Sequence, residues 1–68
     1  MNVLLNGDRV ELPDGATVED AVAATGAHDS RRGLAAALDG EVVPRSRWAD
    51  TALPDDAHVE VLQAVQGG

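Results

Sequence analysis

Closely spaced turn signals limit most strongly what this sequence can fold into. Asn6-Gly7 and Asp39-Gly40 are dipeptides that suit the tight turn of a β-hairpin. Pro13-Asp14-Gly15, Gly26 and Pro54-Asp55-Asp56 interrupt the chain elsewhere. In 68 residues, the segments between these signals have room only for brief strands and one short helix. The sequence therefore predicts one small domain, since a chain of this length does not hold two.

Five of the segments between turns have strand character. The first and last are the most apolar, so we expect them to be central neighbours in a sheet and parallel to each other. In the last segment Val59, Val61 and Val65 alternate with Leu62 and Ala64, so both faces of that strand carry apolar side chains. The predicted strands are residues 1–5, 9–12, 34–38, 41–43 and 57–65.

A single helix is predicted between the second and third strands, over residues 18 to about 25. Thr17 suits the N-cap position, and Asp20 three residues later forms a shorter version of the capping box. Val18, Ala21 and Val22 fall on one helical face. One helix packed on a mixed sheet is an α+β design.

The charge balance restricts the partners of the chain. The chain has twelve acidic and five basic residues, which gives a net charge of -7. Such a surface argues against binding to nucleic acid or to an anionic membrane. No apolar run approaches the ~20 residues that span a bilayer, and no secretion signal opens the chain, so we expect a cytoplasmic protein. A chain this short rarely encloses a substrate pocket, which argues against a self-contained enzyme.

Three stretches of the sequence carry a resemblance to a known family: VLLNG at 3–7, ALDGEVVPRSRWA at 37–49 and VEVLQAVQGG at 59–68. On these residues the chain resembles the ubiquitin-like sulfur carriers of the β-grasp family, most closely the ThiS family of thiamine biosynthesis. The resemblance spans essentially the whole chain. It implies a β-grasp domain over residues 1–65, with a sheet of about five strands and one helix on one face, and a flexible tail over residues 66–68. Two positions depart from the family pattern, because Asp39 stands where we expect Asn and Arg47 where we expect an acidic residue.

The terminal Gly67-Gly68 pair is the candidate reactive site. Glycine has no Cβ and tolerates nearly any backbone conformation, so such a tail can enter a narrow channel in another protein. Residues 66–68 extend about 10 Å when fully stretched. The Gly68 carboxylate is the predicted reacting group, and it needs activation, most simply as an acyl-adenylate. The chain has no phosphate-binding loop motif, so ATP must be held by a partner.

The family resemblance implies a reaction sequence and its partners. A ThiF-like adenylating enzyme activates Gly68 with ATP and Mg²⁺, and a sulfur donor such as a cysteine desulfurase supplies persulfide sulfur that leaves a thiocarboxylate on Gly68. A thiazole synthase (ThiG-like) then takes the sulfur. The chain is expected to bind no cofactor itself, because ATP and Mg²⁺ belong to the activating partner.

Three other functions are compatible with a chain of this kind. The small subunit of molybdopterin synthase is also a sulfur carrier ending in Gly-Gly. A ubiquitin-like modifier would join Gly68 to an amine of a target protein, and an interaction module would have a tail without function. The VVPRS and AVQGG stretches favour the thiamine pathway.

The last strand and the tail also provide the predicted docking surface. If the helix covers the Val59 face, Leu62 and Ala64 lie on the exposed face, where apolar side chains indicate a partner contact. We therefore assign Leu62, Ala64, Val65 and Gln66 to partner binding.

For the other candidate site residues, a structural role is favoured over a functional one. His28 and His58 lack neighbouring ligands, so a metal site is not predicted. The Asp55-Asp56 pair follows a proline and suits a solvated turn better than catalysis. Trp48, the only aromatic residue, is predicted to pack at the edge of the core, with an exposed interface anchor as the alternative.

Overall fold

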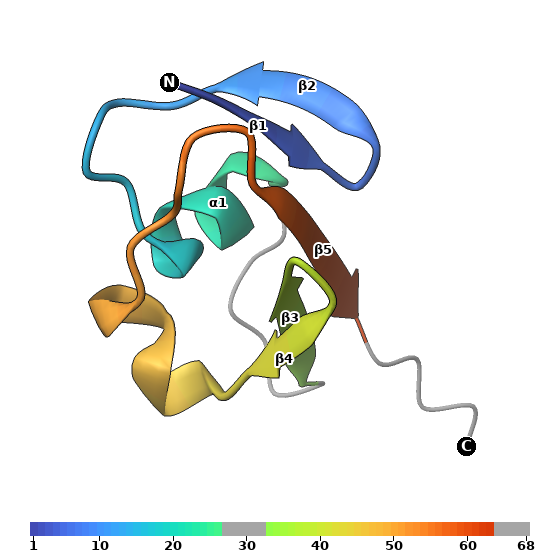
Figure 1. The fold of residues 1–68 in the computed structure, drawn as a ribbon. Coiled ribbons are helices and arrows are strands. Elements are labelled where there is room, and N and C mark those ends of the chain that lie inside the picture. Colours follow the sequence, from blue (N-terminus) through green and yellow to red (C-terminus); the bar gives the residue numbers. More distant parts are fainter. Residues whose placement is uncertain (27–32, 64–68) are drawn as a thin grey trace.

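The computed structural model describes residues 1–26 and 33–63. Within them, five strands form one mixed sheet in the order β2-β1-β5-β3-β4 (Figure 1). Helix α1 lies on one face of this sheet (Figure 1), so the predicted α+β architecture is confirmed. The elements are β1 (Asn2–Leu5), β2 (Asp8–Glu11), α1 (Val18–Ala24), β3 (Leu34–Leu38), β4 (Glu41–Val43), the 3-10 helix η1 (Arg45–Asp50) and β5 (His58–Gln63).

Strand β5 occupies the middle of the sheet. It runs parallel to β1, with Leu4 opposite His58 and Leu5 opposite Val59. It runs antiparallel to β3 over five residue pairs, from Leu34 opposite Gln63 to Leu38 opposite Val59. The prediction that the first and last strands are parallel central neighbours is therefore confirmed.

Two tight turns hold β5 from either side. Asn6 and Asp39, the first residues of the two predicted hairpin turns, have φ values of 53° and 49°, a left-handed conformation that Asn and Asp adopt more readily than most residues. The Asn6 N–H donates to the Val59 carbonyl at 2.9 Å, and its side-chain oxygen accepts from the Val61 N–H at 2.8 Å. Each turn therefore does more than reverse the chain, because it also bonds to the central strand.

The Asp39 turn also uses its main-chain N–H and its side-chain oxygen, here to bond the first residue of β5. The Asp39 N–H donates to the His58 carbonyl at 2.7 Å, and its carboxylate accepts from the His58 N–H at 2.9 Å. An Asn at this position would offer an equivalent acceptor oxygen. The departure from the family pattern at Asp39 therefore preserves the contact.

Helix α1 begins and ends close to the predicted residues. The Thr17 N–H donates to the Asp20 carboxylate at 2.8 Å, and the Asp20 N–H donates to the Thr17 hydroxyl at 3.4 Å, so the capping box is present. The helix ends at Ala24 with Thr25 as its C-cap. Its buried residues are Val18, Ala21 and Val22, as the helical spacing predicted.

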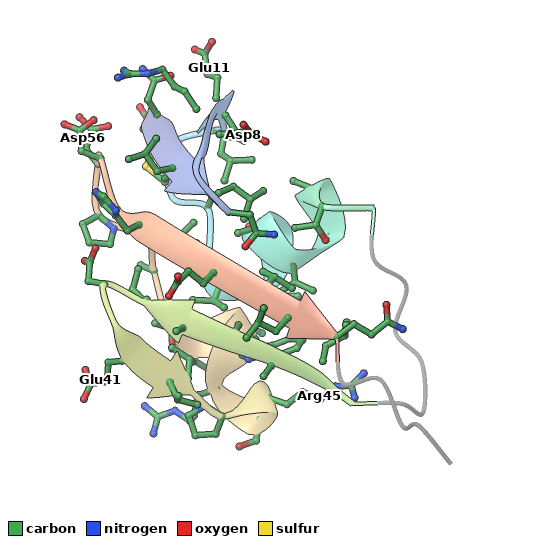
Figure 2. The ribbon with its side chains drawn as sticks, turned by 90° about the vertical axis from the view of Figure 1, so that its right-hand side faces the viewer. Asp8, Glu11, Glu41, Arg45 and Asp56 are labelled. Carbon is green, nitrogen blue, oxygen red and sulfur yellow. The ribbon has the colours of Figure 1, made fainter. Side chains whose placement is uncertain are left out.

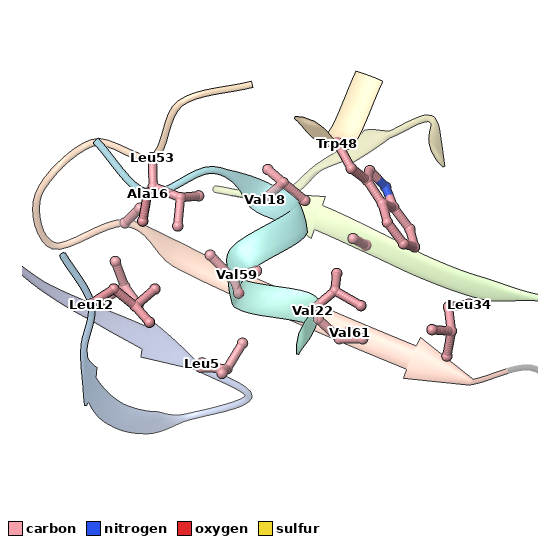
Figure 3. Packing of buried hydrophobic residues seen from close by; sticks show 14 residues of the cluster. Leu5, Leu12, Ala16, Val18, Val22, Leu34, Trp48, Leu53, Val59 and Val61 are labelled. Carbon is pink, nitrogen blue, oxygen red and sulfur yellow. The ribbon is translucent and has the colours of Figure 1, made fainter. Parts of the chain in front are cut away.

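The core lies between α1 and the sheet, as Figure 3 shows. Val3, Val18 and Val59 are the largest side chains that are fully buried. The core is aliphatic apart from one indole ring. Its members are Val3, Leu5, Leu12, Ala16, Val18, Ala21, Val22, Leu34, Ala36, Trp48, Leu53, Ala57, Val59 and Val61.

Some predicted boundaries shift. The second strand lies at Asp8–Glu11, one residue earlier than predicted at each end, although Leu12 still exchanges main-chain hydrogen bonds with Met1 and packs in the core. Between the predicted strands at 41–43 and 57–65, residues Arg45–Asp50 form the 3-10 helix η1. Residues 64 and 65 of the last predicted strand, together with His28, lie outside the described residues.

We predict that Asn6→Ala lowers the free energy of unfolding by about 3 kcal/mol. The variant leaves the Val61 N–H without its acceptor and places alanine, which adopts the left-handed conformation less readily than Asn, at a φ of 53°. Asn6→Gly is the matched control, because glycine removes the acceptor without the conformational cost and should lose about 1–2 kcal/mol less. Urea denaturation measures both values, and equal losses would contradict the double role of Asn6.

Candidate functional site

The candidate site begins where β5 ends. Gly67, Gly68, Ala64, Val65 and Gln66 lie outside the described residues, so the structure tests only the strand that leads to them. Leu62 is the one predicted docking residue that is described, and 69% of it is exposed. Val59 and Val61, on the opposite face of the strand, are buried, so the predicted alternation is confirmed over residues 59–62, the part of it that the structure describes.

The face of the sheet opposite α1 carries a group of apolar side chains. Leu62 lies opposite Ala35 on β3, and Val42 on β4 lies opposite Ala37. Because residues directly opposite each other share a face, these four residues form one surface, which we call the outer patch. Leu62 and Val42, 69% and 71% exposed, are its two large side chains and the only large exposed apolar residues in the described ranges.

Of these four residues, the sequence pattern predicts only Leu62 as a docking residue. The alternation of β3 and β4 contained the signal for the others, because Ala36 is buried and its neighbours Ala35 and Ala37 must face outward. The predicted turn at Asp39-Gly40 also fixes which residues of the two strands pair. The relation between β3 and β5, by contrast, needs the tertiary structure.

Acidic side chains are concentrated away from the end of β5. Figure 2 shows Glu11 and Asp56 near the opposite end of the sheet, and Glu41 at the outer edge of β4. Glu60, opposite Ala37 on the outer face, is the acidic residue that borders the outer patch. The part of the outer face nearest the end of β5 is therefore the less charged part, which suits a contact that excludes water.

Trp48 belongs to the core and not to the docking surface. Only 5% of the residue is exposed, and its indole N–H donates to the Val43 carbonyl at 2.8 Å. The Arg45 guanidinium lies 5.6 Å from the centre of the indole ring, within the range of a cation–π contact. The predicted packing of Trp48 is confirmed, and the alternative of an exposed anchor is wrong.

The other polar candidates are exposed or take part in turn contacts. His58 is exposed at the start of β5, and Asp55 accepts a hydrogen bond from the Asn2 N–H at 3.2 Å. Across residues 1–26 and 33–63, no group of three His, Asp or Glu side chains is arranged to hold a metal ion. The described helices are all too short or too polar to cross a membrane.

A small mixed sheet of five strands with one helix on one face, and with the first and last strands parallel at its centre, defines the β-grasp class of domains. The ThiS family model matches residues 3–68. The chain therefore belongs to the ThiS family, whose members are small sulfur carriers.

Two solved structures agree with this assignment. The crystal structure of the thiamine biosynthesis protein ThiS from Geobacter metallireducens is 26% identical, with full coverage of both chains (100% and 100%) and a TM-score of 0.78. A solution structure of a thiamine biosynthesis protein from the same organism is 27% identical, covers 100% of this chain and 88% of that one, and has a TM-score of 0.77. Among curated protein sequences, none matches the chain significantly.

We predict that Trp48 fluorescence in the native protein is poorly quenched by iodide. The ring is buried, so an aqueous anion cannot approach it. Quenching should rise several-fold in concentrated urea, and N-acetyl-tryptophanamide serves as the fully exposed control. Equal quenching of the native and the unfolded chain would contradict the burial of this side chain.

Proposed function

We propose that this chain carries sulfur as a thiocarboxylate on Gly68 and delivers it to thiazole synthase. The observation that carries the proposal is the family match, which extends through the Gly67-Gly68 pair. The position of β5 also supports the proposal, because only five residues follow this central strand before the chain ends at Gly68. We propose a domain over residues 1–65 and a tail over residues 66–68 that enters the partner enzymes.

The proposed chemistry begins with activation of a poor acyl donor. A Gly68 carboxylate oxygen attacks the α-phosphorus of ATP, pyrophosphate leaves, and an acyl-adenylate remains. The outer sulfur of a persulfide then attacks the acyl carbon, and AMP leaves with the former carboxylate oxygen. A second thiol then attacks the inner sulfur of the resulting acyl disulfide, forms a disulfide with that sulfur and releases the thiocarboxylate. The chain contains no cysteine, so both sulfur atoms and the reducing thiol come from partners.

The activating partner is a ThiF-like adenylating enzyme that holds ATP and Mg²⁺. The chain has a net charge of -7, which disfavours a phosphate site on its own surface. Its sequence has no phosphate-binding loop. We therefore assign ATP binding to the partner. By analogy with the family, we assign sulfur donation to a cysteine desulfurase and place the reactions in the cytoplasm.

The outer patch is the proposed docking surface for the adenylating enzyme and for thiazole synthase. Leu62 stands on it one residue before the end of β5, so a partner that receives the tail also reaches Leu62. An exposed aliphatic side chain of this kind gains free energy when a partner removes it from water. Ala64, Val65 and Gln66 extend the proposed contact along the tail.

We predict that incubation with the adenylating partner, ATP and a persulfide donor changes the intact mass by the replacement of one oxygen with sulfur. Fragmentation should place the change on Gly68, because that residue holds the reacting carboxylate. Omission of ATP is the control and should leave the mass unchanged. An unmodified chain beside a demonstrably active enzyme would contradict the proposal, and chains joined to amines of other proteins would favour the modifier function.

We predict that Leu62→Asp weakens binding to the adenylating enzyme at least tenfold, since burying an unpaired carboxylate costs more than the roughly 1.4 kcal/mol that a factor of ten represents. Ser46→Asp is the control: it adds the same charge at an exposed position of η1, outside the outer patch. Isothermal titration measures both affinities. Equal effects of the two variants would remove Leu62 from the centre of the contact.

A further inference from the structure

Among residues 1–26 and 33–63, no strand pairs with the second half of β5 on the side where β1 lies. In a strand the N–H and C=O of one residue point to the same side, and successive residues alternate. His58 bonds toward the β3–β4 side through Asp39, while Val59 and Val61 bond toward β1 through Asn6. By this alternation the main-chain N–H and C=O of Gln63 also point toward the β1 side.

The β1 side of the sheet ends at Asn6, before β5 does. The two strands share only two residue pairs, the last of which is Leu5 with Val59. The Asn6 side chain then makes the final bond, by accepting from the Val61 N–H. Beyond it the hairpin turns away and β5 continues, as Figures 1 and 2 both show. Within residues 1–26 and 33–63, the Val61 C=O and the Gln63 N–H therefore face an unoccupied strand position.

The two outer edges of the sheet are protected, but this inner edge is not. Three of the four residues of β2 are charged, and β4 has only three residues and is followed by Pro44. Charges, short length and proline are the usual means of preventing a sheet from pairing with another chain. The segment 61–63 carries no charge and no proline, and 69% of Leu62 is exposed.

We propose that this open edge of β5, at Val61 and Gln63, receives an extended segment of the adenylating enzyme as an added strand. The enzyme segment would donate an N–H to the Val61 C=O and accept from the Gln63 N–H, as in other cases of strand addition to a sheet edge. It would also cover one flank of Leu62. This inference rests on the proposed function, because it assumes that the tail is activated by a partner.

The activation step gives a reason for the enzyme to bind the main chain at Gln63. Gly67 and Gly68 have no side chains that a pocket can hold, so contacts at those two residues alone fix the tail poorly along its axis. A bond to Gln63, five residues before Gly68, sets that position, because an extended chain advances about 3.3 Å per residue. Attack on the α-phosphorus of ATP is sensitive to misplacement of this size. We therefore assign the edge to the enzyme that performs this step.

Gln63→Pro tests the proposal directly, because proline lacks the N–H that the enzyme would use and is tolerated where that group faces away from the ladder. We expect a folded variant by thermal unfolding, with binding to the adenylating enzyme and the rate of ATP–pyrophosphate exchange each reduced at least tenfold. Gln63→Ala retains the N–H and should have a much smaller effect.

Glu11→Pro is the matched control on a true outer edge. Val3 and Val10 are opposite each other, and the alternation of β1 places their bonds between the two strands, so the Glu11 N–H faces outward on the free side of β2. This variant should fold and react at the wild-type rate. A folded Gln63→Pro variant that binds and reacts like Glu11→Pro would overturn the inference while the proposed function stands. Failure of the wild-type chain to undergo adenylation would overturn the proposed function itself.

Amide hydrogen exchange of the wild-type chain decides the matter if Gln63→Pro does not fold. The Gln63 amide should exchange rapidly in the free protein and at least tenfold more slowly in the complex with the adenylating enzyme. The Leu62 amide, which faces β3 in both states, is the internal reference. Unchanged exchange at Gln63, or protection only with thiazole synthase or in a dimer of this chain, would overturn the assignment.

Discussion

The fold depends on the way two tight turns hold the central strand. Asn6 and Asp39 each present a main-chain N–H and a side-chain oxygen to β5. The Asn6 bond joins residues 55 positions apart in the sequence and the Asp39 bond residues 19 apart. Local turn chemistry thereby becomes a long-range contact. In a domain that buries as little surface as one of this size, such bonds are a substantial part of the net stability.

The same geometry determines how the chain presents its tail. Because Asn6 ends the pairing with β1, β5 extends beyond the hairpin while β3 still supports its other side. The last described residues of β5 are therefore fixed by β3 and by burial of Val61, and their second edge remains open. An enzyme that binds the end of a strand supported in this way loses less conformational entropy than one that must first order it.

The sequence predicted the elements better than the contacts between them. Turn dipeptides, the Thr17–Asp20 box and the alternation of Val59, Val61 and Leu62 are local signals, and the structure agrees with each of them. The bond from Val61 to Asn6 has no local signal, because Asn6 would suit its turn equally well without it. The outer patch was only partly predicted for the same reason: β3 places Ala35 beside Leu62 through a register that no single segment contains.

A carrier that meets several enzymes must keep one surface free for them and obtain its stability elsewhere. In this chain β5 is stabilised on three sides: by five residue pairs with β3, by the core that packs around Val59 and Val61, and by the short ladder with β1. The outer face at Leu62 and the edge at Gln63 contribute little to these contacts. Because the stabilising and the exposed groups alternate along one strand, a partner can use the exposed groups without disturbing the core, and a substitution such as Leu62→Asp tests binding separately from folding.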